Sequence, residues 1–179
     1  IAHKTEVGGV MPNLQDADAV SPAYDELIAR ARRAKPQARL EGVLVAPMLR
    51  GGVEVILGIH RDPTFGPMVM YGSGGTAVEL FQDVAFASAP LTRERALQLL
   101  ERVRSTRLLR GWRGAPACDE AALVKALLKL SEFAAAHAQQ IESVDINPLV
   151  VRTEGAACLD AVITLRATAG ESTGPAHGH

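Results

Sequence analysis

The sequence predicts an α+β fold, because antiparallel hairpins and amphipathic helices follow one another along the chain. One pair of strand-like segments flanks the turn RDPTFG at residues 61–66, and a second pair flanks RTEG at residues 152–155. Apolar residues recur at helical spacing over about residues 19–34 and 120–138. With 179 residues and no internal repeat, the chain can form one domain or two small lobes.

The first helix is expected over about residues 19–34. Either Asp16 or Asp18 can accept hydrogen bonds from the free N–H groups at its start. Pro36 ends it, because proline has no N–H group and clashes with the preceding turn.

Two more helices are expected in the second half of the chain. One covers about residues 93–105 after Thr92, and the other covers about residues 120–138 after Asp119. Both preceding residues have a side-chain oxygen suited to an N-cap.

Strands are expected where apolar and β-branched residues concentrate between turn residues. Residues 10–14 and 40–48 are predicted as strands in the first part of the chain. Residues 53–60 and 67–71 form the first hairpin, and residues 79–87 form a further strand. The second hairpin joins a strand over about residues 142–151 to one over 156–166.

Composition excludes several classes of protein. With 19 basic and 20 acidic residues, the net charge of −1 gives no support for a general nucleic-acid or acidic-membrane surface. No run of 18 apolar residues indicates a transmembrane helix, and the first residues do not resemble a signal peptide. Cys118 and Cys158 are far apart and in no CxxC pair, so reduced thiols in a cytoplasmic protein are expected.

Arginine and lysine gather in two helix-like segments, and we interpret both groups as solvated helix faces. The members are Arg30, Arg32, Arg33 and Lys35, then Arg102, Arg104, Arg107, Arg110 and Arg113.

The strand SVDINPLVV at residues 143–151 carries oxygen-bearing side chains in an apolar setting. If Thr153 and Glu154 are the turn residues, Asn147 lies opposite Asp160 and Asp145 shares their face. Carboxylate and amide oxygens suit Mg²⁺, which completes its shell with water and phosphate oxygens. The spacing leaves an alternative open: Asn-Pro can form a turn, Pro148 can mark an edge strand, and Asp160 can be hydrogen-bonded.

Three further features are ambiguous from spacing alone. Glu54 lies in an apolar strand, so it either faces a ligand cleft or occupies the polar face of that strand. The glycine-rich stretches HKTEVGGV (3–10) and GSGGT (72–76) can bind anions or form tight turns, and neither matches a P-loop or GxGxxG pattern.

Taken together, these motifs resemble a family. HKTEVGGV, RDPTFGPMVMYGSGGTAVEL, LLRGWRGAPACD and DINPLVV, with LDA following at residues 159–161, are similar to the ATP-grasp domain of NDP-forming (ADP-forming) acyl-CoA synthetases, relatives of the succinyl-CoA synthetase β subunit. The resemblance covers about residues 1–166. It implies an ATP-grasp fold with part of the smaller, nucleotide-binding lobe at 1–46, the larger C-terminal lobe with a magnesium hairpin at 47–166, and a disordered tail at 167–179.

The resemblance also assigns site residues. Asn147 and Asp160 match the magnesium ligands, and Glu54 matches a nucleotide-contacting acid. Lys4, Gly8 and Gly9 match the phosphate loop, while His3 matches a histidine that relays a phosphoryl group. Residues 45–49 (VAPML), which include Ala46, Met48 and Leu49, match the segment whose backbone hydrogen-bonds adenine. Relatives often have Glu or Gln where this chain has Ala46, which puts base selectivity in doubt.

The implied activity is that of an acid–CoA ligase that uses Mg²⁺ and ATP/ADP. A CoA-binding domain or subunit that carries a phosphohistidine is the implied partner, acid and CoA are the substrates, and a cytoplasmic oligomer is expected. Residues before Ile1 would complete the small lobe, so the isolated chain is expected to be incomplete. Two alternatives remain: an ATP-grasp-like regulatory region of a protein lysine acetyltransferase, and a nucleotide-binding module without turnover.

Overall fold

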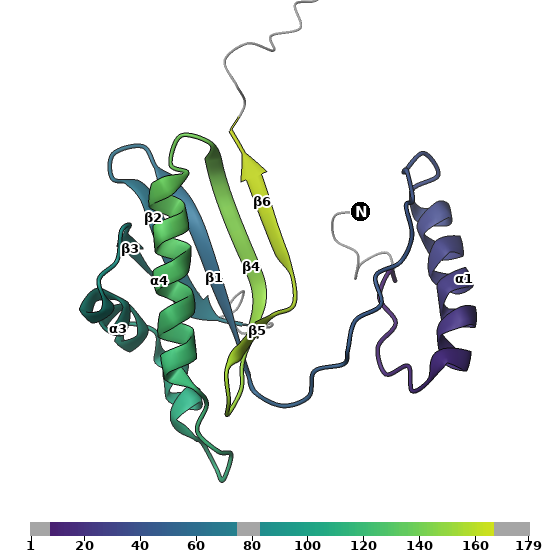
Figure 1. The fold of residues 1–179 in the computed structure, drawn as a ribbon, viewed down its shortest axis with the longest axis horizontal. Coiled ribbons are helices and arrows are strands. Elements are labelled where there is room, and N and C mark those ends of the chain that lie inside the picture. Colours follow the sequence, from purple (N-terminus) through teal and green to yellow (C-terminus); the bar gives the residue numbers. More distant parts are fainter. Residues whose placement is uncertain (1–7, 75–82, 167–179) are drawn as a thin grey trace, which may run out of the picture. The chain divides into compact units, whose positions relative to one another are not determined.

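The computed structural model describes residues 8–74 and 83–166, and the chain divides into two units, residues 1–50 and 51–179 (Figure 1). The predicted disordered tail, His3 and Lys4 lie outside the described residues. No helix in the described ranges is long and apolar enough to cross a membrane.

The first unit contains one helix, α1 (Ala17–Ala34). Asp16 is its N-cap, and the carboxylate accepts a hydrogen bond from the Ala19 N–H at 2.9 Å. The helix ends before Pro36, and its buried side is formed by small and apolar residues, Ala23, Leu27 and Ala31. The predicted position and N-cap of this helix are therefore confirmed.

The two strands predicted in the first unit are wrong. Residues 10–14 and 40–48 are irregular, and within the second segment Leu44 is 90% exposed and Val45 is 66% exposed. Apolar and β-branched content does not by itself make a strand, because a strand needs a neighbour for its backbone hydrogen bonds. No residue that the structure describes provides such a neighbour here.

The second unit is built on an antiparallel sheet with strand order β3-β2-β1-β4-β5, and β6 also pairs with β4 (Figure 1). The strands are β1 (Val53–Asp62), β2 (Gly66–Ser73), β3 (Val84–Ser88), β4 (Ile141–Val151), β5 (Ala156–Cys158) and β6 (Ala161–Leu165). Both predicted hairpins are confirmed. The strand predicted at 79–87 is confirmed from Val84, and its earlier residues lie outside the described ranges.

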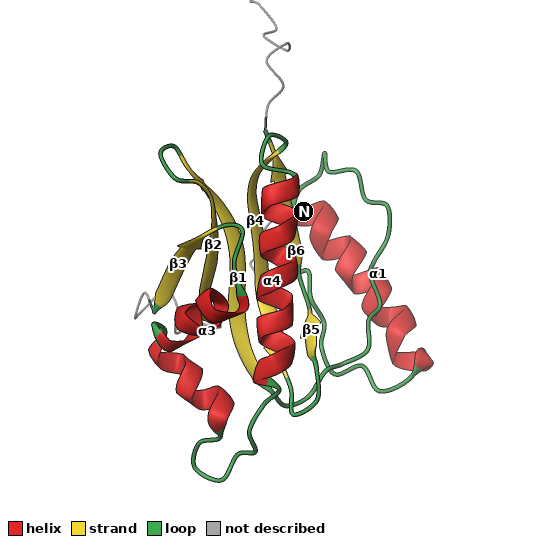
Figure 2. Cartoon of the chain, turned by 60° about the vertical axis from the view of Figure 1, so that its left-hand side comes forward, coloured by secondary structure: helices red, strands yellow, loops and turns green. Residues whose placement is uncertain are grey.

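The helices of the second unit are α3 (Arg93–Glu101), the 3-10 helix η1 (Arg104–Arg110) and α4 (Glu120–Ala136). Figure 2 shows α3 and α4 on one face of the sheet. Among the described residues, the opposite sheet face carries no helix of this unit.

The single helix predicted over 93–105 is shorter than expected, because Val103 adopts an extended conformation and a new helix begins after it. Asp83 stabilises the start of this new helix. Its carboxylate accepts hydrogen bonds from the N–H groups of Arg104 at 2.9 Å and Ser105 at 2.8 Å. Burial opposes ionisation of this group, but the two N–H donors prevail and hold the pKa of the Asp83 carboxyl below its ordinary value.

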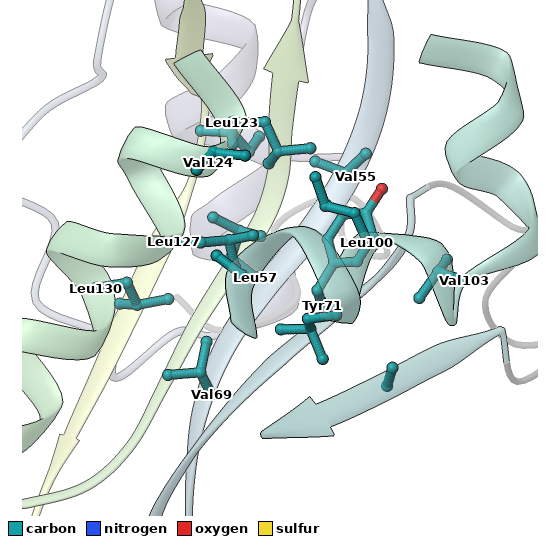
Figure 3. Packing of buried hydrophobic residues seen from close by; sticks show 14 of the residues in the cluster. Val55, Leu57, Val69, Tyr71, Leu100, Val103, Leu123, Val124, Leu127 and Leu130 are labelled. Carbon is teal, nitrogen blue, oxygen red and sulfur yellow. The ribbon is translucent and has the colours of Figure 1, made fainter. Parts of the chain in front are cut away.

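The core lies between the sheet and the helices (Figure 3). Strand residues Val55, Leu57, Val69 and Tyr71 meet apolar residues of the helical layer, which include Leu100, Val103, Leu123, Val124, Leu127 and Leu130. The Tyr71 hydroxyl lies 3.0 Å from the Thr106 hydroxyl, which donates to the Leu100 carbonyl at 2.7 Å. Burial raises the pKa of Tyr71 to about 12, so the phenol remains neutral at physiological pH.

We expect Tyr71→Phe to lower the free energy of unfolding by about 1 kcal/mol, because the buried Thr106 hydroxyl loses its phenol partner. Urea unfolding of the chain measures this difference. Tyr24→Phe is the matched control, since Tyr24 is 46% exposed and surface substitutions change stability by less than about 0.5 kcal/mol. Equal unfolding free energies for the two variants would contradict a role for this hydrogen bond.

Candidate functional site

The second hairpin has the predicted register. Arg152 N–H donates to the Gly155 carbonyl at 3.0 Å, and Asp145 pairs with Val162. Asn147 N–H donates to the Asp160 carbonyl at 3.2 Å, so these two residues lie directly opposite each other. The Cβ atoms of directly opposite residues lie about 5 Å apart, so one small ion can contact both side chains.

A β-bulge at Asn147 and Pro148 sets the direction of the Asn147 side chain. Val55 pairs with Leu149, but Leu57 pairs with Ile146, so two residues of β4 lie opposite the single residue Ile56. The extra residue changes the phase of the strand. Ile146 and Leu149 therefore both face the helical core, while Asn147 is exposed on the other side.

The alternative in which Pro148 marks an edge strand does not hold, because β4 lies between β1 on one side and β5 and β6 on the other. Proline lacks an N–H group and is excluded from the regular part of an interior strand, but a bulge tolerates it. The Asn147–Pro148 peptide bond is cis, and the Pro148 carbonyl accepts a hydrogen bond from the Leu159 N–H at 3.0 Å.

Glu54 lies on the same sheet face as Asn147. In β1 the odd-numbered residues Val55 and Leu57 are buried against the helices, so alternation directs Glu54 to the opposite face, where it is exposed. Its partner in β4 is Val150, on the turn side of the bulge. Asp145 is also exposed on this face. The structure therefore brings Glu54, Asn147, Asp160 and Asp145 together on the sheet face away from the helices.

The donor set of this face fits Mg²⁺. An amide oxygen from Asn147 and a carboxylate from Asp160 are hard ligands, and Mg²⁺ commonly takes one or two protein carboxylates. Within the described ranges, no group of three or more His, Cys, Asp or Glu side chains is placed to hold a metal ion. A Mg²⁺ ion held by this pair would thus have most of its coordination positions available for water and phosphate oxygens.

The described glycines of GSGGT allow close backbone packing beside Glu54. Gly74 N–H donates to the Glu54 carbonyl at 3.0 Å, and a Cβ atom on Gly74 would lie 2.5 Å from the Glu54 carbonyl carbon. A Cβ atom on Gly72 would lie 2.6 Å from Val84 Cγ1. Both distances are far inside van der Waals contact, so only glycine fits without a shift. The remaining residues of this stretch lie outside the described ranges.

Five of the predicted site residues lie in the described part of the first unit: Gly8, Gly9, Ala46, Met48 and Leu49. Gly8 has a positive φ of 64°, and its carbonyl accepts a hydrogen bond from Arg30 Nη1 at 3.2 Å. Gly9 is half-buried beside it. Ala46, Met48 and Leu49 lie in the irregular segment before the second unit, where Met48 is 53% exposed.

Asp119 fixes the turn of the second hairpin, and the sequence indicated only its role as an N-cap. One carboxylate oxygen accepts from the Ala122 N–H of α4 at 2.9 Å, and the other accepts from the Gly155 N–H at 2.9 Å. The Asp119 N–H also donates to the Arg152 carbonyl at 2.7 Å. The start of α4 and the turn of the hairpin are thereby held together. The N–H groups of Gly155 and Ala122 hold the pKa of the Asp119 carboxyl below its ordinary value.

Comparison with known proteins identifies relatives over almost the whole chain. A family model described as an ATP-grasp domain matches residues 1–165. The chain is 41% identical over 160 residues to an ADP-forming acetate–CoA ligase of Archaeoglobus fulgidus, covering 89% of this chain and 23% of that protein. It is 38% identical over 165 residues to the β subunit of the ADP-forming acetate–CoA ligase I of Pyrococcus furiosus, covering 92% of this chain and 71% of that subunit.

Solved structures agree with this match. An acetyl-CoA synthetase of Ca. Korarchaeum cryptofilum, solved with coenzyme A and Ca-AMPCP, has a TM-score of 0.84 and 39% identity, covering 93% of this chain and 72% of that chain. The same synthetase with coenzyme A and Mg-AMPPCP is described with its phosphohistidine segment pointing towards the nucleotide-binding site. It has a TM-score of 0.80 and 38% identity, covering 92% of this chain and 71% of that chain.

We expect Asp119→Asn to lower the melting temperature at neutral pH, because an asparagine has one acceptor oxygen for two N–H groups. The folded-state pKa of Asp119 is below its unfolded value. Its stabilisation is therefore present above the unfolded pKa, about 4, and is lost as pH falls through the folded value. Thermal unfolding from pH 7 to about pH 3 should show the difference from wild type disappear.

Glu154→Gln is the matched control, because it removes the same charge from an exposed position in the same turn. A gap between Asp119→Asn and wild type that stays constant with pH would contradict the proposed origin of this stabilisation.

Proposed function

The chain belongs to the ATP-grasp domain family, and from this membership we propose that it forms the nucleotide-binding part of an ADP-forming acyl-CoA synthetase. The observation that carries the proposal is the oxygen face of the second hairpin, where Asn147 and Asp160 lie opposite each other at the β4 bulge. The relatives named as ADP-forming ligases support the reaction class. The chain spans about 23% of the single-chain relative and 71% of the β subunit, so the activity is that of a larger protein.

The overall reaction converts an acid, CoA and ATP into acyl-CoA, ADP and phosphate. ATP transfers its γ-phosphoryl group to a histidine of a partner domain and leaves as ADP. The phosphohistidine transfers the group to the carboxylate of the acid, which gives an acyl phosphate and regenerates histidine. The thiol of CoA then attacks the acyl carbon and releases phosphate. The partner must provide the CoA-binding site and the histidine.

In this scheme Asn147 and Asp160 hold Mg²⁺ through their side-chain oxygens. When bound, Mg²⁺ supplies positive charge that neutralises the phosphate oxygens and orients them. The bulge keeps Asn147 on the oxygen face, and the Asp119 contacts keep the hairpin turn in place. Glu54 lies on the same face, two positions before Ile56 in β1, and we assign it to the ribose hydroxyl groups as an acceptor. Positioning of charge and phosphate, rather than covalent chemistry by the protein, supplies most of the catalysis of phosphoryl transfer.

Adenine recognition is assigned to the backbone of the segment that contains Ala46, Met48 and Leu49. The methyl group of Ala46 offers no side-chain hydrogen bond to a base, so we propose that selection between ATP and GTP rests on backbone groups alone. His3, Lys4, Gly8 and Gly9 are assigned to the phosphate loop and the phosphoryl relay, by resemblance to the family.

We expect Asn147→Ala and Asp160→Ala each to weaken Mg²⁺-dependent ADP binding by the full-length protein roughly tenfold or more. Substitution of residues that only support the direct ligands of a metal already lowers metal affinity about tenfold or more, and loss of a direct ligand should have at least that effect. Isothermal titration calorimetry with ADP, with Mg²⁺ and with a chelator in its place, measures the effect. The loss should be confined to the Mg²⁺ arm, since ADP alone does not require the ion-binding pair.

Asp145→Ala is the matched control, because Asp145 is an exposed carboxylate on the same strand and face. It should bind Mg-ADP like the wild type. Unchanged Mg-ADP affinity in both Asn147→Ala and Asp160→Ala would overturn the assignment of the metal site.

A further inference from the structure

The 3-10 helix η1 presents a row of arginine side chains to solvent. A 3-10 helix has about three residues per turn, so residues three apart in sequence lie above one another. Val103, at its N-cap, and then Thr106 and Leu109 follow one side and are 2%, 2% and 1% exposed. The next positions along, Arg104, Arg107 and Arg110, therefore form a row on an adjacent side, and all three are exposed.

The loop after η1 extends this row with two unusual residues. Trp112 begins a turn whose hydrogen bond runs from the Ala115 N–H to the Trp112 carbonyl at 3.0 Å. The central residues Arg113 and Gly114 have positive φ values of 50° and 86°. Glycine, asparagine or aspartate ordinarily fills such a turn, and here the exposed Arg113 side chain stands at its tip.

Positive charge on this part of the surface is only partly compensated within the described chain, by the carboxylates of Asp83 near Arg104 and Glu101 near Arg107. Residues 102–113 contain five arginines and no acid. Arg110 forms salt bridges with Glu101 and Glu120. Arg104, Arg107 and Arg113 form none with any residue that the structure describes.

Exposed apolar residues lie among these charges: Trp112 is 56% exposed and Leu108 is 43% exposed. Arginine and tryptophan are the residues that most often dominate protein interfaces, because both combine a large apolar surface with a polar group. We call Arg104, Arg107, Leu108, Trp112 and Arg113 the arginine–tryptophan surface. A solvated helix face, the interpretation from sequence, does not require tryptophan, leucine or a left-handed arginine.

The arginine–tryptophan surface begins at the end of the sheet that carries Glu54. The Asp83 carboxylate accepts from the Arg104 and Ser105 N–H groups, and the Asp83 carbonyl accepts from the Ser73 N–H at 3.1 Å. The next residue, Gly74, donates to the Glu54 carbonyl. Three successive hydrogen-bonded contacts thus connect η1 to the strand that holds the proposed nucleotide-contacting acid.

We propose that the arginine–tryptophan surface docks an acidic face of the partner domain that carries the phosphorylated histidine. This inference rests on the proposed function, because a synthetase of that class must bring a histidine to the γ-phosphate and release it again. Arginines steer an acidic partner and shorten the search for the docked position, while Trp112 and Leu108 supply apolar contact. The three hydrogen-bonded contacts connect this surface to β1, the strand that carries Glu54, the acid assigned to the ribose of the nucleotide.

The test uses the full-length protein, with its partner subunit where that is a separate chain, and ATP labelled in the γ-phosphate with Mg²⁺. The initial rate of label transfer to histidine is measured at low and at high salt, and ADP affinity is measured on the same samples. The variants are Arg107→Glu, Trp112→Ala and Arg113→Gly. Glycine suits the positive φ at position 113, so this last variant removes the charge without straining the fold. Lys129→Glu, an exposed position on α4, is the control for an equal change of charge.

Arg107→Glu should lower the rate of label transfer about tenfold at low salt, with a smaller loss at high salt, because charged surfaces steer association and salt screens them. Trp112→Ala and Arg113→Gly should lower the rate as well, and Lys129→Glu should not. ADP affinity should be unchanged in all four variants.

Rates equal to wild type in the three surface variants would overturn the docking surface while leaving the proposed function intact. A loss of rate that follows weaker ADP binding would also overturn it, since the surface would then act on the nucleotide. Absence of label transfer in the wild-type protein would overturn the proposed function itself.

Discussion

The interruption of β4 at Asn147 and Pro148 is the constraint on which the rest of the second unit depends. A regular strand that buried Ile146 would direct Leu149 to the opposite face, and the core would lose one of the two. The extra residue in the bulge resolves this conflict, because both apolar side chains reach the helical core. The same change of phase leaves Asn147 exposed opposite Asp160. Core packing and the oxygen face are thus two consequences of one local irregularity.

The sequence alone predicted the features that depend on residues close together in the chain, and missed those that depend on residues far apart. The register of the second hairpin follows from a short turn and the alternation of side chains, which are local, and it was predicted correctly. The bulge was not foreseen, because it is defined by the pairing of β4 with β1, almost 90 residues earlier. The start of η1 depends in the same way on contacts with Asp83, which is distant in sequence. The supposed strand at 40–48 had the right composition and no partner among the described residues.

Five carboxylates in the second unit fall into two groups by what they contact. Asp62, Asp83 and Asp119 accept hydrogen bonds from backbone N–H groups of turns and helix starts, and these contacts lower their pKa values. Such carboxylates hold the chain in place. Glu54 and Asp145 are exposed on the oxygen face, and their side chains accept no hydrogen bond from any residue in the described ranges. The sequence does not separate the groups, because all five are acids beside strands or turns.

The two functional surfaces of the second unit differ in sign, and this difference fits a division of labour. The oxygen face presents Asn147 and Asp160, the proposed ligands of a cation, and the exposed carboxylates of Glu54 and Asp145 lie on the same face. The arginine–tryptophan surface presents Arg104, Arg107 and Arg113, which form no salt bridge with any residue that the structure describes. An acidic partner would be repelled from the first surface and attracted to the second, so it would approach the nucleotide from the side of η1. In the proposed complex, the separation of charge would therefore guide a partner towards the phosphates without letting it compete for the proposed metal site.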